Sequence, residues 1–322
     1  MTSGELLGRF QGLRALVIGD LMLDEYIFGR AARISPEAPV MVIRQTSTDR
    51  LPGGAANVAR NLLALGARTR ILGVVGCDEA GELLRQSLRD QGLEAEHLVA
   101  DPTRPTTRKT RVVADHSHQV LRIDHEDEAG VPVEAETKLV DAALQMVGDT
   151  DVIVLSDYLK GALTQRLARE VIERARKAGV PVVANPKPRS LSLYEKASLV
   201  SLNRSEAAEA LGLWAGLPDD NAVSAARQIL ERQKSDSVLV TLGESGMVAV
   251  GPSDVRVNAP RVEVYDTAGA GDTVIATVAL GYAAAGFERA VFELAAQTAA
   301  SVVKHVGVAT PSVEDLDRMR SI

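Results

Sequence analysis

Residues 151–186 read DVIVLSDYLKGALTQRLAREVIERARKAGVPVVANP and contain the pattern that decides the fold. The first run, 151–158, is short, apolar and rich in β-branched residues, which is typical of a buried strand. A helical pattern follows at 163–179, and a second apolar run begins at residue 180. A strand, a helix and another strand in this order predict a βαβ unit, whose two strands lie parallel in one sheet.

The same alternation extends from this unit toward both ends of the chain. Runs with the composition of buried strands alternate with helical patterns, which predicts an α/β fold with a mostly parallel sheet flanked by helices. The further runs that carry this alternation are 14–20, 55–67, 69–76, 80–93 and 236–242.

Two segments, 25–50 and 106–124, interrupt this alternation. The second reads TTRKTRVVADHSHQVLRID, which indicates two strands around a polar turn. We expect both segments to form a small antiparallel lid over the main sheet. No linker rich in Pro or Ser and no fixed-period repeat divides the chain. Residues 1–322 are therefore predicted to form a single domain in which the lid is inserted.

The composition narrows the range of partners. A formal net charge of -7 argues against general affinity for nucleic acid or for acidic membranes. Charged residues interrupt the N-terminal segment, and no later stretch approaches a charge-free membrane span, so we expect a cytoplasmic protein. One cysteine, Cys77, and five scattered histidines provide neither a disulfide framework nor a transition-metal motif.

The stretch DTAGAGDTVIA, residues 266–276, places two glycines at the start of a predicted buried helix. Unpaired N–H groups and the helix dipole favour an anion there. Asp272 would repel a resting phosphate, so its position favours another role, which is to accept the proton of an attacking alcohol during phosphoryl transfer. From these residues alone, a plain helix start remains an alternative. The N–H groups expected to bind the anion are those of Gly269, Ala270 and Gly271.

A second glycine cluster opens the stretch GGAANVARNLLALGA, residues 53–67. Gly53 and Gly54 allow a ligand to approach the backbone closely, and the short amide of Asn57 suits sugar hydroxyls. The alternative is a glycine turn before a helix. Neither cluster matches the Walker or the dinucleotide-binding fingerprint, which weakens both of those common explanations.

Together the two stretches resemble the motifs of the ribokinase-like, or PfkB, carbohydrate kinase family. The likeness covers essentially the whole chain and includes, in order, GVVGCDEAG, LSDYLKG, NRSEAAEALG and TLGESGM. Within that family, residues 19–40 (GDLMLDEYIFGRAARISPEAPV), RKTRVV and QVLRID are most similar to the heptose 7-phosphate kinase branch. The resemblance implies a three-layer αβα sandwich with a small β-sheet lid, ATP as donor, Mg²⁺ as cofactor and a sugar hydroxyl as acceptor.

The resemblance also implies roles for particular residues. It makes Asp272 the catalytic base beside the anion hole. Asn203 and Glu206 match a motif that organises Mg²⁺ and the nucleotide phosphates through waters, which makes Glu206 a water-mediated metal contact. The nucleotide loop that follows the strand at 236–242 corresponds to Thr241, Gly243 and Gly246.

For the acceptor, Asp20 and Asp24 are candidates to bind sugar hydroxyls beside the glycine cluster. A sugar phosphate also needs cations, because a buried phosphate loses its hydration. The candidate cations are Lys109, Arg111, Arg122, Lys160 and Lys187, of which Arg111 and Arg122 are favoured by their place in the lid.

The resemblance implies phosphorylation of the anomeric hydroxyl of D-glycero-β-D-manno-heptose 7-phosphate to the 1,7-bisphosphate. The stretch NPKPR at 185–189 stands where the branch has DPKG, which leaves another sugar or sugar phosphate open. An inactive sugar-binding or nucleotide-binding regulator is the alternative from another class. The family also implies a homodimer formed through the lid.

Overall fold

The computed structural model describes residues 1–115, 118–127, 129–305 and 307–320. The main sheet of these residues has eight strands in the order β14, β13, β12, β11, β10, β9, β1, β4. In the run from β4 through β1, β9, β10 and β11 to β12, neighbouring strands pair in parallel. β13 and β14 add antiparallel pairs at one edge. In sheet order the bounds are Asp254–Val257, Met247–Val250, Ser237–Thr241, Leu199–Asn203, Val182–Asn185, Val152–Ser156, Arg14–Gly19 and Arg68–Leu72.

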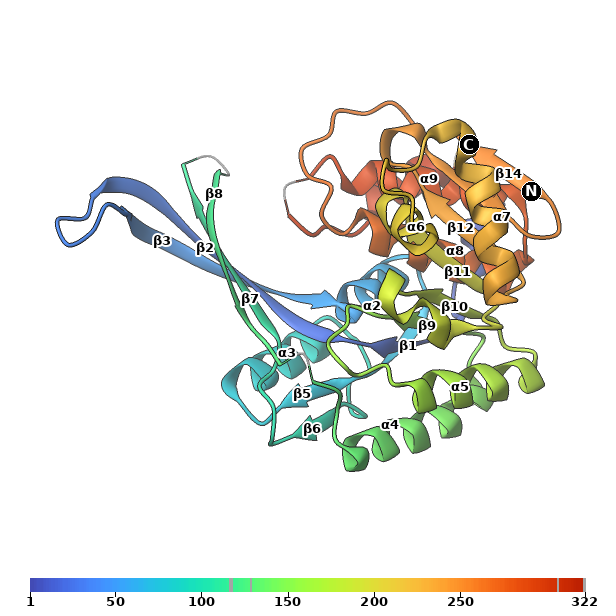
Figure 1. Ribbon diagram of the computed structural model, residues 1–322, viewed down its shortest axis with the longest axis horizontal. Coiled ribbons are helices and arrows are strands. Elements are labelled where there is room, and N and C mark those ends of the chain that lie inside the picture. The colour runs from blue at the N-terminus through green and yellow to red at the C-terminus, as the bar shows by residue number, and fades with distance from the viewer. Residues whose placement is uncertain (116–117, 128, 306, 321–322) are drawn as a thin grey trace.

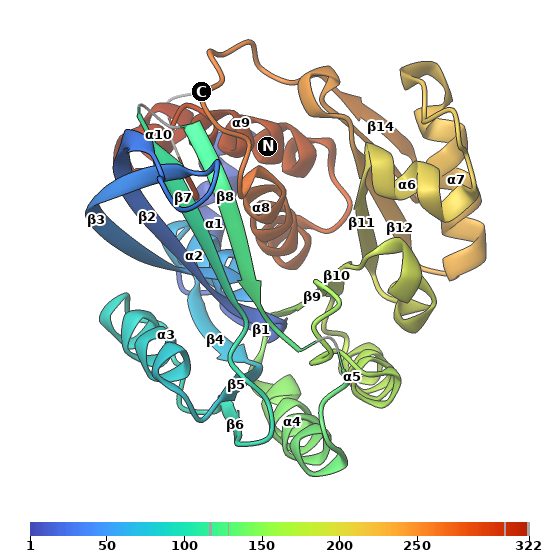
Figure 2. The same cartoon turned by 60° about the vertical axis from the view of Figure 1, so that its left-hand side comes forward.

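Helices cover both faces of this sheet, and Figure 2 shows the two helix layers on either side of the strands. One layer contains α1 (Ser3–Phe10), α2 (Ala55–Ala64), α3 (Glu79–Asp90), α8 (Ala270–Ala285), α9 (Arg289–Val302) and α10 (Val313–Arg320). The other contains α4 (Val133–Met146), α5 (Gln165–Ala178), α6 (Arg204–Leu211) and α7 (Ala222–Gln233).

Alternation along the strands explains the two layers. In β1, Ala15 and Val17 belong to the first hydrophobic core, whereas Leu16 and Ile18 belong to the second. Successive side chains of a strand point to opposite faces, so a strand that is apolar throughout must be covered on both. The predicted three-layer αβα sandwich is confirmed.

The βαβ unit at 151–186 forms as its sequence predicts. The Thr164 hydroxyl caps the start of α5 by accepting the Leu167 N–H at 3.1 Å, and Gly179 ends the helix with a left-handed φ of 71°. β9 and β10 then pair in parallel.

Four further strands form the lid, which projects from the body of the molecule in Figure 1. The strands pair in the order β3, β2, β7, β8, and their bounds are Met41–Gly54, Leu21–Ile34, Arg108–Ala114 and His118–His125. The lid is not purely antiparallel, because β2 and β7 pair in parallel. β2 and β3 also extend beyond the predicted segment 25–50, since the Leu21 and Gly54 ends pair inside the core. The division into one domain with an inserted lid stays a prediction.

The remaining short elements connect these layers. A separate two-stranded sheet pairs β5 (Val74–Gly76) with β6 (Val99–Asp101). Single turns of 3₁₀ helix are η1 (Val147–Asp149), η3 (Asp219–Asn221) and η4 (Gly243–Ser245), and η2 (Pro188–Tyr194) is longer. Within the described part of the chain, no helix combines the length and the apolar character that crossing a membrane requires.

The position of α8 explains why its sequence is apolar on all sides. The helix packs against α1, α2 and α9 and against β9 of the sheet, so that every residue from Thr273 to Gly281 is buried. A helix that is surrounded by protein buries its whole circumference. Its first turn is partly exposed, and that turn contains Asp272.

Candidate active site

The candidate site lies where parallel strands of the main sheet end. β10, β11 and β12 end at Asn185, Asn203 and Thr241, and the first turn of α8 brings Asp272 to the same place. Ligands of open α/β sheets bind outside the carboxyl ends of the strands. A cavity of about 110 Å³ is lined there by Tyr158, Asn185, Lys187, Ser201, Leu202, Asn203, Glu206, Thr241, Gly271 and Asp272.

The start of α8, where the anion hole is predicted, combines a left-handed glycine with an open one. Gly269 is the N-cap and has a left-handed φ of 80°, and a Cβ there would lie 3.0 Å from the Asn57 amide nitrogen. A Cβ at Gly271 would meet nothing within 4 Å, so this glycine borders open space. The N–H of Ala270 donates to the Thr267 carbonyl at 3.3 Å.

The Asp272 carboxylate is held at both oxygens. The Asn57 amide donates to Oδ2 at 2.7 Å, and the Tyr158 hydroxyl donates to Oδ1 at 2.6 Å. Burial raises the pKa of the Asp272 carboxyl, although these two hydrogen bonds and the charge of Lys187 oppose the rise. Burial also raises the pKa of Tyr158 well above its ordinary value, and the Asp272 charge adds to this, so the phenol stays protonated and donates.

The two glycine motifs of the sequence meet through this contact. On α2, Asn57 binds Asp272, and Asn61 one turn later accepts the Thr273 hydroxyl at 2.8 Å. The sequence predicts Asn57 as a sugar ligand, whereas its amide contacts the candidate base in the structure. Tyr158 is not among the predicted site residues. Its motif LSDYLKG is among the stretches that resemble the family, but nothing in the sequence shows that the Tyr158 ring reaches α8.

Lys187 and Glu206 lie together on another side of the cavity. The Lys187 ammonium is 2.7 Å from Oε1 of Glu206 and 5.3 Å from the centre of the Tyr158 ring. Asn203 and Glu206 form a capping box, in which each side chain accepts the backbone N–H of the other at 2.8 to 2.9 Å.

The nucleotide-loop glycines lie just outside this cavity. Thr241 ends β12 and lines the cavity, but Gly243 and Gly246 belong to the turn that follows. Gly246 has a φ of 87°, and a Cβ there would overlap the Val257 carbonyl, so this glycine allows β13 to turn back beside β12.

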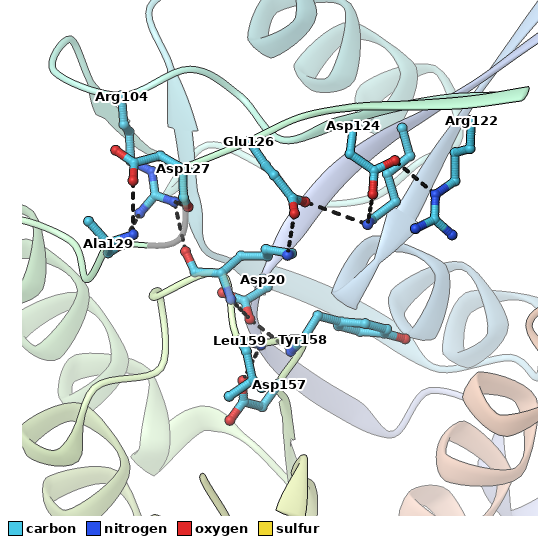
Figure 3. A network of polar contacts seen from close by, with 12 residues as sticks. Asp20, Arg104, Arg122, Asp124, Glu126, Asp127, Ala129, Asp157, Tyr158 and Leu159 are labelled. Atoms are coloured by element: carbon cyan, nitrogen blue, oxygen red, sulfur yellow. Dashed lines mark hydrogen bonds and ion pairs between the residues drawn. The ribbon is translucent and has the colours of Figure 1, made fainter. Parts of the chain in front are cut away.

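Asp20, a predicted sugar ligand, also contacts a backbone turn. Its side chain is buried, and its carboxylate accepts the backbone N–H groups of Tyr158, Lys160 and Ala162 at 2.8, 2.9 and 3.0 Å. Figure 3 shows Asp20 against this turn. Three of the four acceptor positions of this carboxylate therefore hold the turn, and one position on Oδ1 remains.

Asp24 is placed beside the glycine cluster. Its carboxylate lies 2.5 Å from the Arg111 guanidinium, which is also 5.2 Å from the centre of the Tyr26 ring. A Cβ at Gly53 would overlap Oδ2 of Asp24, so the glycine leaves room for this carboxylate. Gly54, with a φ of 61°, is the N-cap of α2.

The lid cations form a chain of alternating charges (Figure 3). Arg122 faces Arg111 across β7 and β8 and donates to Asp124 at 2.9 Å, with half of its side chain exposed. Lys109 contacts Asp124 at 3.2 Å and Glu126 at 3.5 Å. Lys160 reaches Glu126 at 2.7 Å, which joins the end of the lid to the turn that Asp20 holds.

A family model for the pfkB family carbohydrate kinases matches residues 14–315, and the chain belongs to this family. It is therefore a carbohydrate kinase, a phosphotransferase, and kinases of this family generally use ATP. The particular relatives include the bifunctional protein HldE of Bradyrhizobium diazoefficiens, which is 42% identical over 310 residues and covers 95% of this chain. HldE of Nitrobacter hamburgensis is 42% identical over 319 residues, 97% of this chain. The chain spans about 63 to 64% of the length of these relatives.

Solved structures show the same fold at lower identity. Phosphofructokinase-2 from Escherichia coli in complex with potassium superimposes with a TM-score of 0.81 at 21% identity, covering 97% of this chain and 98% of that one. Ribokinase from Arabidopsis thaliana, complexed with ribose and ATP, gives a TM-score of 0.76 at 19% identity, covering 97% of this chain and 100% of that one.

Proposed function

We propose that this protein phosphorylates the anomeric hydroxyl of D-glycero-β-D-manno-heptose 7-phosphate with ATP and produces the 1,7-bisphosphate. The observation that carries the proposal is the Asp272 carboxylate, held by two donors in the first turn of α8 and facing the cavity that Lys187 and Glu206 line. The 42% identity to HldE proteins favours the heptose phosphate as acceptor.

In the proposed reaction, the anomeric oxygen forms a bond to the γ-phosphorus of ATP while the bond to the β,γ-bridging oxygen breaks. ADP leaves with the electron pair of that bond, and the hydroxyl proton passes to an oxygen of Asp272. A late proton acceptor is sufficient, because phosphoryl transfer depends mainly on positioning and on neutralising charge. We assign the N–H groups of Gly269, Ala270 and Gly271 to the transferring phosphoryl oxygens. The Ala270 N–H then exchanges its bond to the Thr267 carbonyl for one to the phosphoryl group.

The nucleotide side of the site is assigned to the ends of β11 and β12. Asn203 and Thr241 line the cavity beside Asp272, and Gly243 and Gly246 shape the adjoining turn. We assign them to the phosphates and ribose of ATP.

Mg²⁺ fits this site as an ion that keeps its waters. The described residues hold no group of three or more His, Cys, Asp or Glu side chains suited to a metal, and Mg²⁺ bound to ATP phosphates needs few protein ligands. Glu206 lines the cavity and is the residue we assign to its water shell. When bound, Mg²⁺ supplies charge neutralisation on the phosphates.

The acceptor side is assigned to the lid and the glycine cluster. Asp24 lies in the space that Gly53 leaves and accepts sugar hydroxyls, and Gly54 allows close approach at the start of α2. The cations assigned to the substrate phosphate are Arg111, Arg122 and Lys187.

We further propose that two copies pair through their lids. β8 is an edge strand whose residues are all exposed, including Leu121 at 52% and Ile123 at 53%. An uncovered apolar edge strand is open to pairing with another strand, and a second copy offers the same edge in a closed symmetric arrangement.

The test combines an acceptor panel with one variant. ATP consumption and product phosphorylation are measured with heptose 7-phosphate, fructose phosphates, ribose and adenosine. Asp272→Asn should fold and bind ATP but lose at least about 100-fold in kcat, because its amide accepts no proton. Asp254→Asn, an exposed change on β14, should turn over normally.

Two results would contradict the proposal in different ways. Activity confined to an unphosphorylated sugar would exclude the heptose phosphate and point to the altered stretch at 185–189. Near-normal turnover by Asp272→Asn would remove this residue from its role as base.

A further inference from the structure

Tyr158 donates to Asp272 from a separate element. The tyrosine follows β9, whereas Asp272 opens α8, and the 2.6 Å hydrogen bond joins residues that are 114 positions apart. On the other carboxylate oxygen, the Asn57 amide donates from α2 at 2.7 Å. Behind it, Arg60 donates to the side-chain oxygen Oδ1 of Asn57 at 3.3 Å, which fixes the direction of the amide.

The backbone that presents Tyr158 is held in a strained turn. Leu159 has a left-handed φ of 57°, a conformation that costs a residue with a Cβ roughly 1 kcal/mol or more. The Asp157 carboxylate accepts the Leu159 N–H at 2.7 Å, and Asp20 accepts the N–H groups on either side of it. Figure 3 shows both carboxylates packed against this turn, with the Tyr158 ring extending away from them. Two buried carboxylates thus fix the direction of one ring.

The ring itself has little freedom to turn away from Asp272. The Lys187 ammonium lies 5.3 Å from the ring centre and is tied to Glu206 at 2.7 Å. The phenol therefore stands between a carboxylate at its hydroxyl and a cation at its face. A buried tyrosine hydroxyl usually finds a hydrogen-bond partner, and the partner of Tyr158 is the carboxylate proposed as the base.

We propose that Tyr158 is a positioning residue for phosphoryl transfer, whose hydroxyl holds the Asp272 carboxylate in the orientation that receives the acceptor's proton. The proposal rests on the assignment of Asp272 as the base. Each carboxylate oxygen has two acceptor positions, so Tyr158 and Asn57 occupy one on each and leave one on each for the acceptor hydroxyl. With both oxygens held, the carboxylate cannot rotate, and the two free acceptor positions point in fixed directions.

The same contact has an electrostatic consequence. A hydrogen bond to the ionised carboxylate favours that form, so the loss of the Tyr158 hydroxyl raises the pKa of Asp272 further. A base must be ionised to accept a proton, and activity is lost as the pH falls through its pKa. The acidic limb of the rate profile therefore moves to higher pH without this hydroxyl. The other charged groups around Asp272 are Lys187 after β10, Asp24 on β2, Glu206 on α6 and Arg60 behind Asn57.

The experiment compares Tyr158→Phe with Tyr282→Phe. Tyr282 lies near the far end of α8, and its hydroxyl is 2.5 Å from the Ser237 hydroxyl. Tyr282→Phe therefore removes a phenol hydroxyl from the helix that carries Asp272 without changing the site. For Tyr158→Phe we expect kcat to fall about tenfold or more. The KM for ATP should stay within about twofold, and the acidic limb of kcat against pH should move upward. Tyr282→Phe should match the unchanged protein in all three.

Folding is checked by thermal unfolding with and without ATP. If Tyr158→Phe fails this check, the same measurements are made on Tyr158→Met, which lacks the same donor. A folded variant with unchanged kcat and an unmoved acidic limb would overturn the role of Tyr158. If Asp272→Asn is inactive in the same assay, only the positioning role of Tyr158 is excluded. If Asp272→Asn is active, the assignment of Asp272 as the base is excluded.

Discussion

At the scale of single residues, the site depends on the space that glycines leave for neighbouring side chains. Gly53 has space for the Asp24 carboxylate only because it lacks a Cβ, and Asp24 is then placed beside Arg111. Gly269 similarly allows the Asn57 amide to approach the first turn of α8. Glycine at these positions is required by close approach of a named atom, and at Gly269 by a left-handed backbone as well.

Gly53→Ala should weaken binding of the acceptor while leaving ATP binding intact. The new methyl group would push the Asp24 carboxylate aside, and this movable side chain yields before the backbone does. We expect the KM for the acceptor to rise about tenfold, corresponding to about 1.4 kcal/mol, with the KM for ATP unchanged. Gly8→Ala on α1, where a Cβ meets nothing within 4 Å, is the matched control. An unchanged acceptor KM in Gly53→Ala would count against Asp24 as a sugar ligand.

At the scale of elements, the packing of α2 against α8 builds the candidate active site. Asn57 and Asn61 lie one turn apart on α2 and meet the adjacent residues Asp272 and Thr273 of α8. Residues four apart share a helix face, so both asparagines point to the same neighbour. The second pair is fully buried and lies next to Asp272, where it fixes how the two helices fit together.

Thr273→Val should destabilise the protein by about 1–3 kcal/mol, because it leaves the buried Asn61 carbonyl oxygen without its donor. Denaturant unfolding measures this change. The double variant with Asn61→Leu should cost less than the sum of the two single changes. Thr46→Val on β3 removes an exposed hydroxyl contact and should change stability by no more than about 0.5 kcal/mol. Strict additivity would show that the Asn61 contact does not couple the helices.

At the scale of the whole molecule, the lid is the part that the two helix layers leave uncovered. Figure 1 shows its strands leaving the main sheet and extending away from the helices. Exposed apolar side chains gather on it, namely Ile34, Val40, Met41, Val120, Leu121 and Ile123. The lid is continuous with the site, since β2 carries Asp24 and β7 carries Arg111.

Leu121→Asp combined with Ile123→Asp should convert a lid-paired dimer into monomers, because two charges on each edge strand oppose its pairing. Light scattering after size-exclusion chromatography gives the mass. Val133→Asp on α4 is the control, since Val133 is 75% exposed and lies outside the lid. A wild-type protein that is monomeric at all concentrations, or a double variant that stays dimeric, would exclude this interface.

The sequence predicted the fold because its signals are local. Strand runs, helix caps such as Thr164 and Gly179, and the glycines before α8 each act over a few neighbouring residues. Asn203, Glu206 and Thr241 were predicted from stretches that resemble family motifs, and all three line one cavity where β11 and β12 end. The parallel pairing of β2 with β7 was missed, because no short-range pattern specifies which distant strands meet.

The sequence by itself determined the class of fold, the family and the place of Asp272 at a helix start, since each rests on residue order over a short span. Only the tertiary structure decided what holds that carboxylate. It turned Asn57 toward the base, assigned Asp20 to a turn, and brought Tyr158 across from β9 to α8. The physical reason is that a hydrogen bond depends on distance and direction in space, and residues 114 or 215 positions apart acquire these only when the layers pack.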